Sequence, residues 1–134
     1  MNSNICLDTN ILIYLFDSNN IKKREIAENL IIENALISFQ SVSEFINVSS
    51  RLLKYSKREI LKDCNKIILN LEVIPFTNQI LSKAELLIFK YDFQIFDSII
   101  IASALSSECE ILYSEDFQNE MLIEGKLKII NPFL

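Results

Sequence analysis

Short apolar runs alternate with helix-length segments along this chain, and that alternation limits the folds available to it. Apolar strands are predicted at 4–7, 36–38, 72–74, 111–113 and 127–130. Helices are predicted between them, at 10–16, 22–34, 43–54, 57–71, 79–91 and 97–105. Strands separated by helices indicate parallel β-α-β units. Because the strands are uniformly apolar, helices are expected on both faces of the sheet.

Length and composition favour one domain over residues 1–134. Half of the 134 residues are hydrophobic, and one glycine and two prolines leave no flexible linker. The chain has no histidine, which excludes Ser-His and Cys-His nucleophile systems and argues against Cys/His zinc sites. Three scattered cysteines, Cys6, Cys64 and Cys109, predict reduced thiols in a cytosolic protein.

Membrane insertion is not expected. The apolar run at 11–16 is flanked by Asp8 and Asp17 and is far shorter than the ~20 residues that a membrane span needs. The N-terminal residues carry no basic stretch of the signal-peptide kind. A cytoplasmic location is therefore the expectation.

Four acidic residues occur where predicted elements meet. Asp8 follows the first strand, Glu44 the second and Asp116 the fourth, while Asp97 begins the most apolar helix. Ligands of parallel α/β sheets bind outside the carboxyl ends of the strands, so the four acids are expected at one edge. Crowded carboxylates repel one another, and a cation that prefers oxygen ligands relieves this repulsion. The pattern predicts that Asp8, Glu44, Asp97 and Asp116 bind Mg²⁺, with Mn²⁺ as an alternative ion.

Each acid also has a purely structural interpretation. Asp8, Asp97 and Asp116 are each candidates for the N-cap of a following helix. Ser41-x-x-Glu44 has the pattern of a capping box. Taken singly, each acid is explained by capping, whereas the occurrence of all four beside apolar segments favours a shared site.

The motifs together resemble those of a known family. Leu7-Asp8-Thr9-Asn10, Ser43-Glu44-Phe45, the segment FDSIIIASA from Phe96 and the segment YSEDF from Tyr113 are similar to those of PIN-domain proteins, and most similar to VapC-type ribonuclease toxins. The resemblance implies a three-layer α/β/α fold with a twisted, mainly parallel sheet. It also implies that Asn10 and Ser114 orient the ligands or their waters. One departure lies at 106–110, where the family often has a glycine and this chain has none.

The function implied by the resemblance is Mg²⁺-dependent cleavage of RNA. A metal-activated water would attack the phosphodiester and leave a 5′-phosphate and a 3′-hydroxyl. Such proteins are usually dimeric toxins held inactive by an antitoxin. The alternative is a PIN module that binds RNA or a partner without cleavage. A haloacid-dehalogenase phosphatase is excluded because its second aspartate is replaced by Asn10, and a receiver domain because Ser114 occupies its lysine position.

Basic residues are concentrated in one stretch of an acidic chain. The net charge is −5, yet residues 51–66 contain six basic and two acidic side chains. An acidic catalytic pocket needs cations elsewhere to hold flanking phosphates. We predict that Arg51, Lys54, Lys57 and Arg58 form an RNA track. A solvated helix face is the competing interpretation of the same residues.

Overall fold

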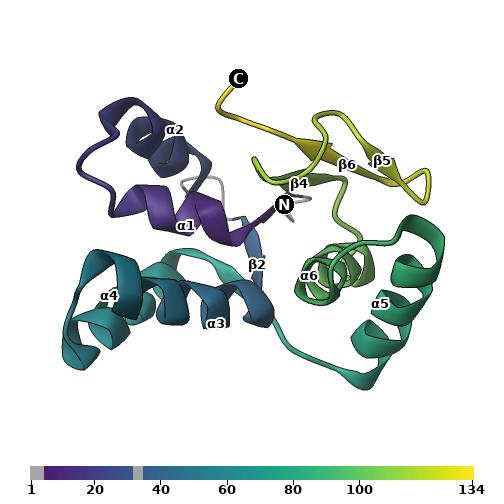
Figure 1. The fold of residues 1–134 in the computed structure, drawn as a ribbon, viewed down its shortest axis with the longest axis horizontal. Helices are drawn as coiled ribbons and strands as arrows, with labels where there is room; N and C mark the ends of the chain where they lie inside the picture. The colour runs from purple at the N-terminus through teal and green to yellow at the C-terminus, as the bar shows by residue number, and fades with distance from the viewer. Residues whose placement is uncertain (1–4, 32–34) are drawn as a thin grey trace.

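A six-stranded sheet forms the centre of the molecule (Figure 1). The computed structural model describes residues 5–31 and 35–134, apart from the side chains of residues 52 and 53. The strand order is β3-β2-β1-β4-β6-β5, and all neighbours are parallel except β5 and β6. The strands are β1 Ile5–Leu7, β2 Leu36–Ser38, β3 Glu72–Ile74, β4 Ile111–Tyr113, β5 Leu122–Ile123 and β6 Leu127–Ile130. The predicted mainly parallel α/β fold is confirmed.

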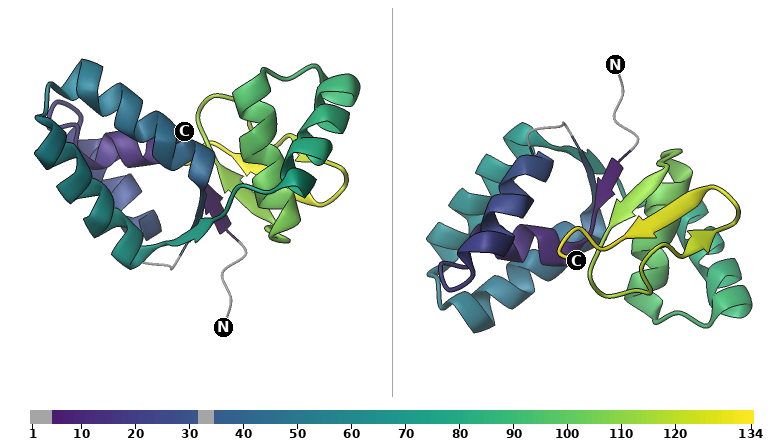
Figure 2. Two further views of the ribbon diagram at one scale, coloured as in Figure 1. Left: turned by 90° about the horizontal axis from the view of Figure 1, so that it is seen from below. Right: turned by 90° about the horizontal axis from the view of Figure 1, so that it is seen from above.

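Helices cover both faces of this sheet (Figure 2). The first face packs against α1 Thr9–Leu15, α2 Ile21–Ile31, α3 Phe39–Val48 and α4 Lys57–Asn70, and the second against α5 Asn78–Tyr91 and α6 Ile95–Ser106. Consecutive residues of β1 point to opposite faces, because side chains alternate along a strand. Cys6 enters the core beneath α5 and α6, and Leu7 enters the core beneath α1–α4. This explains why the strand is apolar without alternation.

The predicted start of the third helix, at residue 43, was wrong, because Ser38 caps α3. The Ser38 hydroxyl accepts a hydrogen bond from the Ser41 amide at 3.0 Å, so α3 begins at Phe39 instead of residue 43. Ser41 is therefore buried inside the helix, and Ser41-x-x-Glu44 is not a capping box. After Val48 the helix widens into a π-helix, Ser49–Leu53, and it ends at Lys54 in a left-handed conformation.

One strand was not predicted. β5 has only two residues and pairs with β6 in a hairpin whose turn residues, Glu124 and Gly125, have φ of 55° and 67°. The Lys126 amide closes this turn on the Ile123 carbonyl at 3.0 Å. Three residues, 124–126, connect the two strands, and the second of the two successive positive φ values falls at the chain's single glycine, which adopts this conformation without steric cost.

The remaining boundaries agree with the sequence to within a few residues. β1 begins at Ile5 and α2 ends at Ile31, while Asn4 and residues 32–34 lie outside the described residues. In the 106–110 turn that lacks a glycine, Glu108 takes the left-handed conformation, with φ 58°. The three cysteines are buried free thiols. No helix in the described ranges is long and apolar enough to cross a membrane.

Candidate active site

Asp8 is held at the carboxyl end of β1, which lies between β2 and β4. Its backbone amide donates to the Tyr113 carbonyl at 3.0 Å, extending the β1–β4 ladder by one residue. Its side chain is 2% exposed, and it accepts hydrogen bonds from the Thr9 amide at 2.6 Å and the Ser114 hydroxyl at 2.7 Å. The carboxylate is thus fixed in orientation by two uncharged donors.

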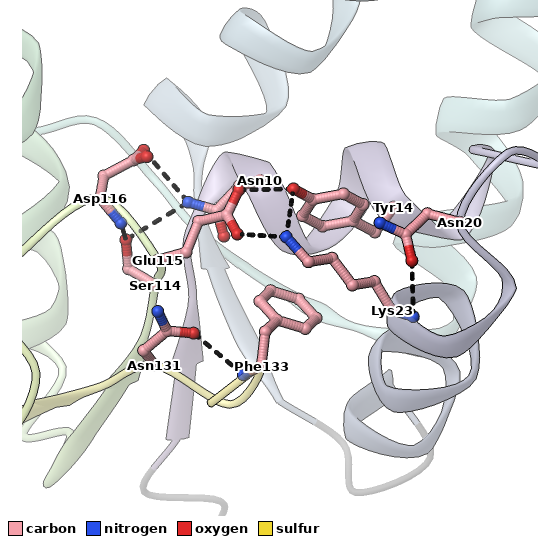
Figure 3. Close-up of polar contacts among 9 residues, drawn as sticks. All are labelled: Asn10, Tyr14, Asn20, Lys23, Ser114, Glu115, Asp116, Asn131 and Phe133. Atoms are coloured by element: carbon pink, nitrogen blue, oxygen red, sulfur yellow. Dashed lines mark hydrogen bonds and ion pairs between the residues drawn. The ribbon is translucent and has the colours of Figure 1, made fainter.

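Ser114 donates to Asp8, and it also contacts Asn10 and Asp116, as Figure 3 shows. The Ser114 hydroxyl accepts from the Asp116 amide at 3.1 Å and from the Asn10 side-chain amide at 3.3 Å. The same Asn10 nitrogen donates to the Asp116 carboxylate at 3.1 Å. Among the described residues, the Asn10 Oδ1 atom is buried and has no hydrogen-bond partner. The structure therefore brings both predicted supporting residues into contact with the acids.

Glu44 and Asp97 are contributed by helices and are half-buried. Glu44 lies in the middle of α3 and accepts from the Thr9 hydroxyl at 3.2 Å and the Gln40 side-chain amide at 3.0 Å. Asp97 lies in the first turn of α6, which begins at Ile95, so the helix starts two residues earlier than predicted. Thr9 and Gln40 were missed in the sequence. Gln40 was missed because the predicted helix began at residue 43, so the contact between Gln40 and Glu44, four residues apart on one helix, was not considered. No local sequence pattern pairs Thr9 with Glu44.

The capping interpretation holds for one of the four acids. Asp8 is the N-cap of α1. Gln94 occupies that position for α6, Glu44 is inside a helix, and no helix follows Asp116 in the described 35–134 range. Capping alone therefore does not account for the four acids.

The electrostatic environment of Asp8 and Asp97 is unfavourable to their charged forms. Burial raises the pKa of Asp8 to about 7, and repulsion from Asp116 and Glu44 adds to the effect of burial, while the Ser114 and Thr9 hydrogen bonds oppose it. Burial also raises the pKa of Asp97, again with repulsion from Asp116 and Glu44. In the part of the chain that the structure describes, no lysine or arginine is hydrogen-bonded or ion-paired to any of the four. The four acids thus influence one another without a compensating cation.

The arrangement suits an ion with few protein ligands better than one enclosed by protein. Among the described residues, no three acidic or cysteine side chains are grouped closely enough to ligate a single ion. Mg²⁺ keeps several waters and is commonly held by one or two carboxylates. An oxygen-only donor set without counter-charge, with the unpaired Asn10 Oδ1 beside it, fits such an ion. The assignment of all four acids to one metal centre stays a prediction.

The predicted RNA track is exposed. Arg51 lies in the π-helix, Lys54 ends it, and Lys57 and Arg58 form the start of α4. Within the described ranges, none of the four takes part in an ion pair. The structure is consistent with both the RNA track and the solvated face.

Comparison with known proteins identifies the family. The family model of the PIN domain matches residues 5–119. This chain belongs to the PIN domain family. The match includes Asp8, Glu44, Asp97 and Asp116, and it confirms the resemblance found in the sequence motifs. No curated protein sequence matches this PIN domain protein.

Three solved structures share the fold of this chain at low sequence identity. A toxin–antitoxin complex from Klebsiella pneumoniae is similar with a TM-score of 0.72 at 21% identity, covering 96% of this chain and 97% of that one. The sarcin–ricin loop cleaving toxin VapC20 from Mycobacterium tuberculosis has a TM-score of 0.69 at 17% identity, covering 84% and 89%. FitAcB from Neisseria gonorrhoeae has a TM-score of 0.69 at 19% identity, covering 96% and 98%.

Proposed function

We propose that this PIN domain protein is a cytoplasmic Mg²⁺-dependent endoribonuclease and the toxin of a toxin–antitoxin pair. The observation that carries the proposal is that Asp8 and Asp97 are each repelled by both Asp116 and Glu44, with no cation paired to any of the four among the described residues. A stable fold keeps such an arrangement at a cost, since charges without partners destabilise the native state. A bound divalent cation would offset that cost, and its binding would explain why the four carboxylates lie together.

The neighbours support the biological context. One of the similar structures is described as a toxin–antitoxin complex, and another as a toxin that cleaves the sarcin–ricin loop. An RNA substrate and an antitoxin partner for this chain follow by analogy. We further propose a homodimer, because large apolar side chains on α5 and at the start of α6 are exposed, notably Phe89, Ile95 and Phe96.

The mechanism assigns each residue a task. Asp8 and Asp97 would hold Mg²⁺, which would supply Lewis acidity when bound. The Ser114 and Thr9 donors keep the Asp8 carboxylate in one orientation. Glu44 or Asp116 would accept the proton of the attacking water. As the new P–O bond forms, the bond to the 3′ oxygen breaks and this oxygen takes up a proton from solvent, which leaves a 5′-phosphate and a 3′-hydroxyl.

Binding of the rest of the substrate is assigned to the exposed basic residues. The metal contacts only the scissile phosphate, so neighbouring phosphates need other cations. Arg51, Lys54, Lys57 and Arg58 are exposed and available for this role.

The test is cleavage of RNA by purified protein with and without Mg²⁺. The wild type is expected to cut only with metal, and Asp8→Asn to be inactive, because the amide removes the charge that holds the cation. Asp63→Asn on α4 removes the same charge away from the four acids and is expected to retain activity. RNA binding without cleavage would instead support a non-cleaving PIN module.

A further inference from the structure

A tyrosine, a lysine and a glutamate form a closed cluster beside the candidate active site (Figure 3). The Tyr14 hydroxyl donates to the Glu115 carboxylate at 2.6 Å. The Lys23 ammonium donates to the other Glu115 oxygen at 3.1 Å and to the Tyr14 hydroxyl at 3.0 Å. Both oxygens of Glu115 are therefore bound, one to each partner.

Lys23 is itself held in place. It lies in the first turn of α2, where its backbone amide donates to the Asn20 side chain at 3.3 Å. Its ammonium lies 4.7 Å from the ring centroid of Tyr14 and 5.3 Å from that of Phe133, which packs edge-on against Tyr14. Cation–π attraction to both rings adds to the ion pair. The side chains of Lys23 and Glu115 are largely shielded from solvent, with 32% and 25% of their surface exposed.

The cluster is directly linked to the acids through the chain. Glu115 stands between Ser114 and Asp116, and its side chain points away from that of Asp116 (Figure 3). Helix α1 contacts both carboxylates: Asn10 donates to Asp116, and Tyr14, four residues later, donates to Glu115. Residues four apart lie on one face of a helix. One face of α1 thus fixes two successive residues of the segment after β4.

We propose that Lys23 and Tyr14 are positioning residues for the site, in that they anchor Glu115 outside the acidic group and so fix the Ser114–Asp116 segment. The role in metal binding rests on the proposed function. Ser114 donates to Asp8, and the Asp116 amide donates to Ser114, so movement of this segment disturbs both acids.

Removal of Lys23 is expected to weaken Mg²⁺ binding, for reasons of charge and geometry. Without Lys23, Glu115 keeps its negative charge next to Asp116 but loses its cation and one hydrogen-bond donor. The segment then becomes mobile, and Ser114 no longer holds Asp8 in a single orientation. Partners that orient metal ligands typically change metal affinity by 10–100-fold when they are removed.

The experiment compares Lys23→Met with Lys90→Met. Lys90, on α5, forms an ion pair with Glu124 at 2.6 Å, and Tyr91 donates a hydrogen bond to the same carboxylate. These three residues form a second cluster of the same composition. Calorimetric titration with Mg²⁺ is expected to show a Kd raised ~10–100-fold in Lys23→Met and unchanged in Lys90→Met. Lys23→Arg, which keeps the charge and the ring contacts, is expected to restore the affinity. In a Glu115→Gln background, Lys23→Met is expected to add little, because its effect acts through Glu115.

A second readout needs no metal. Hydrogen exchange of the Asp116 amide, which is bonded to Ser114, is expected to be faster in metal-free Lys23→Met than in the wild type or Lys90→Met. Equal Mg²⁺ affinity and equal Asp116 protection in the two lysine variants would overturn the proposal and leave the proposed function standing. A wild-type protein that neither binds Mg²⁺ nor cleaves RNA would overturn the proposed function, while Asp116 protection would still decide whether Lys23 positions the segment.

Discussion

Glu124 and Asp8 show two opposite uses of a carboxylate within one sheet. Glu124, in the β5–β6 turn, accepts hydrogen bonds from the ammonium groups of Lys83 at 3.2 Å and Lys90 at 2.6 Å. It also accepts one from the Tyr91 hydroxyl at 3.1 Å. Those donors, Lys90 first, lower its pKa to about 2. Asp8 has two uncharged donors, and burial raises its pKa to about 7.

The difference shows where a carboxylate is neutralised within the protein and where it is left without a cation among the described residues. At Glu124 the charge is neutralised within the chain, and it fastens the hairpin to α5. At Asp8 the neighbouring Asp116 and Glu44 repel the carboxylate charge, and a cation bound there would reduce this repulsion. Glu115 lies between these extremes, because it is beside the site but neutralised by Lys23.

The largest expected effect is on the pH dependence of stability at Asp8. A raised folded pKa means that the native state binds the proton more tightly, so the contribution of Asp8 to the free energy of unfolding is largest below 3.8 and falls as pH rises towards 7. The full shift corresponds to on the order of 4 kcal/mol. Metal-free Asp8→Asn is therefore expected to exceed the wild type in stability at about pH 8 and to approach it near pH 4.

Urea unfolding in chelator at the two pH values measures this difference. Asp63→Asn serves as the control and is expected to follow the wild type at both. If the stability difference between Asp8→Asn and the wild type is the same at both pH values, Asp8 is not destabilised by its charge.

Next in size is the response to metal. A ligand that binds only the native state at ~100 times its Kd adds roughly 2.7 kcal/mol. Mg²⁺ is therefore expected to raise the melting temperature of the wild type, and to leave Asp8→Asn/Asp97→Asn unchanged. Thermal melts across a Mg²⁺ series provide the measurement. The same rise in the double variant would make the effect nonspecific.

Glu124→Gln is expected to have a smaller effect of the opposite sign. A lowered folded pKa stabilises the protein above the ordinary value of 4.5, and this contribution disappears as pH falls towards 2. The variant is expected to melt below the wild type at neutral pH and to lose less stability on acidification. Glu85→Gln, at an exposed position on α5, is the matched control. Identical melting of the two variants at neutral pH would contradict the role given to Glu124.

The smallest effect on stability is expected from substitutions in the basic stretch 51–66, which is distant in sequence from both Asp8 and Glu124. Arg51→Gln/Lys54→Gln/Arg58→Gln is expected to weaken RNA binding and to reduce the slope of log K against log salt by about 2, if each side chain contacts one phosphate. The Mg²⁺-dependent melting shift should be unchanged. Normal RNA binding at physiological salt would favour the solvated-face interpretation of these residues.

The sequence predicted those features that depend on local pattern. β1, β2 and β4 are apolar and contain no exposed residue, so they could be found, as could the acids that follow them. β3 and β6 were found as well, although each contains one exposed charged residue, Glu72 and Lys128. The two-residue β5 carries too little pattern to be recognised. The start of α3 was misplaced because Ser38 and Ser41 are both plausible caps, and the choice depends on burial of Ser38 against the sheet.

Long-range contacts of the site could not be predicted in the same way. Tyr14, Lys23 and Glu115 lie on three separate elements, and nothing in their local sequence distinguishes them from solvent-exposed polar residues. Family resemblance supplied Asn10 and Ser114, but the Thr9 donor to Glu44 became visible only when α1 and α3 were packed together.

The position of β1 between β2 and β4 has a consequence for synthesis of the protein. Asp8 is translated early, yet its partner Ser114 is 106 residues further along the chain. Chains fold from the N-terminus as they emerge from the ribosome at about 5–20 residues per second. On the nascent chain, the edge formed by β1 and β2 can assemble with α1–α4 before β4 is translated, but the acidic group cannot be completed. A ribosome-bound intermediate of this protein is therefore without its proposed nuclease centre until residues 114–116 have left the exit tunnel.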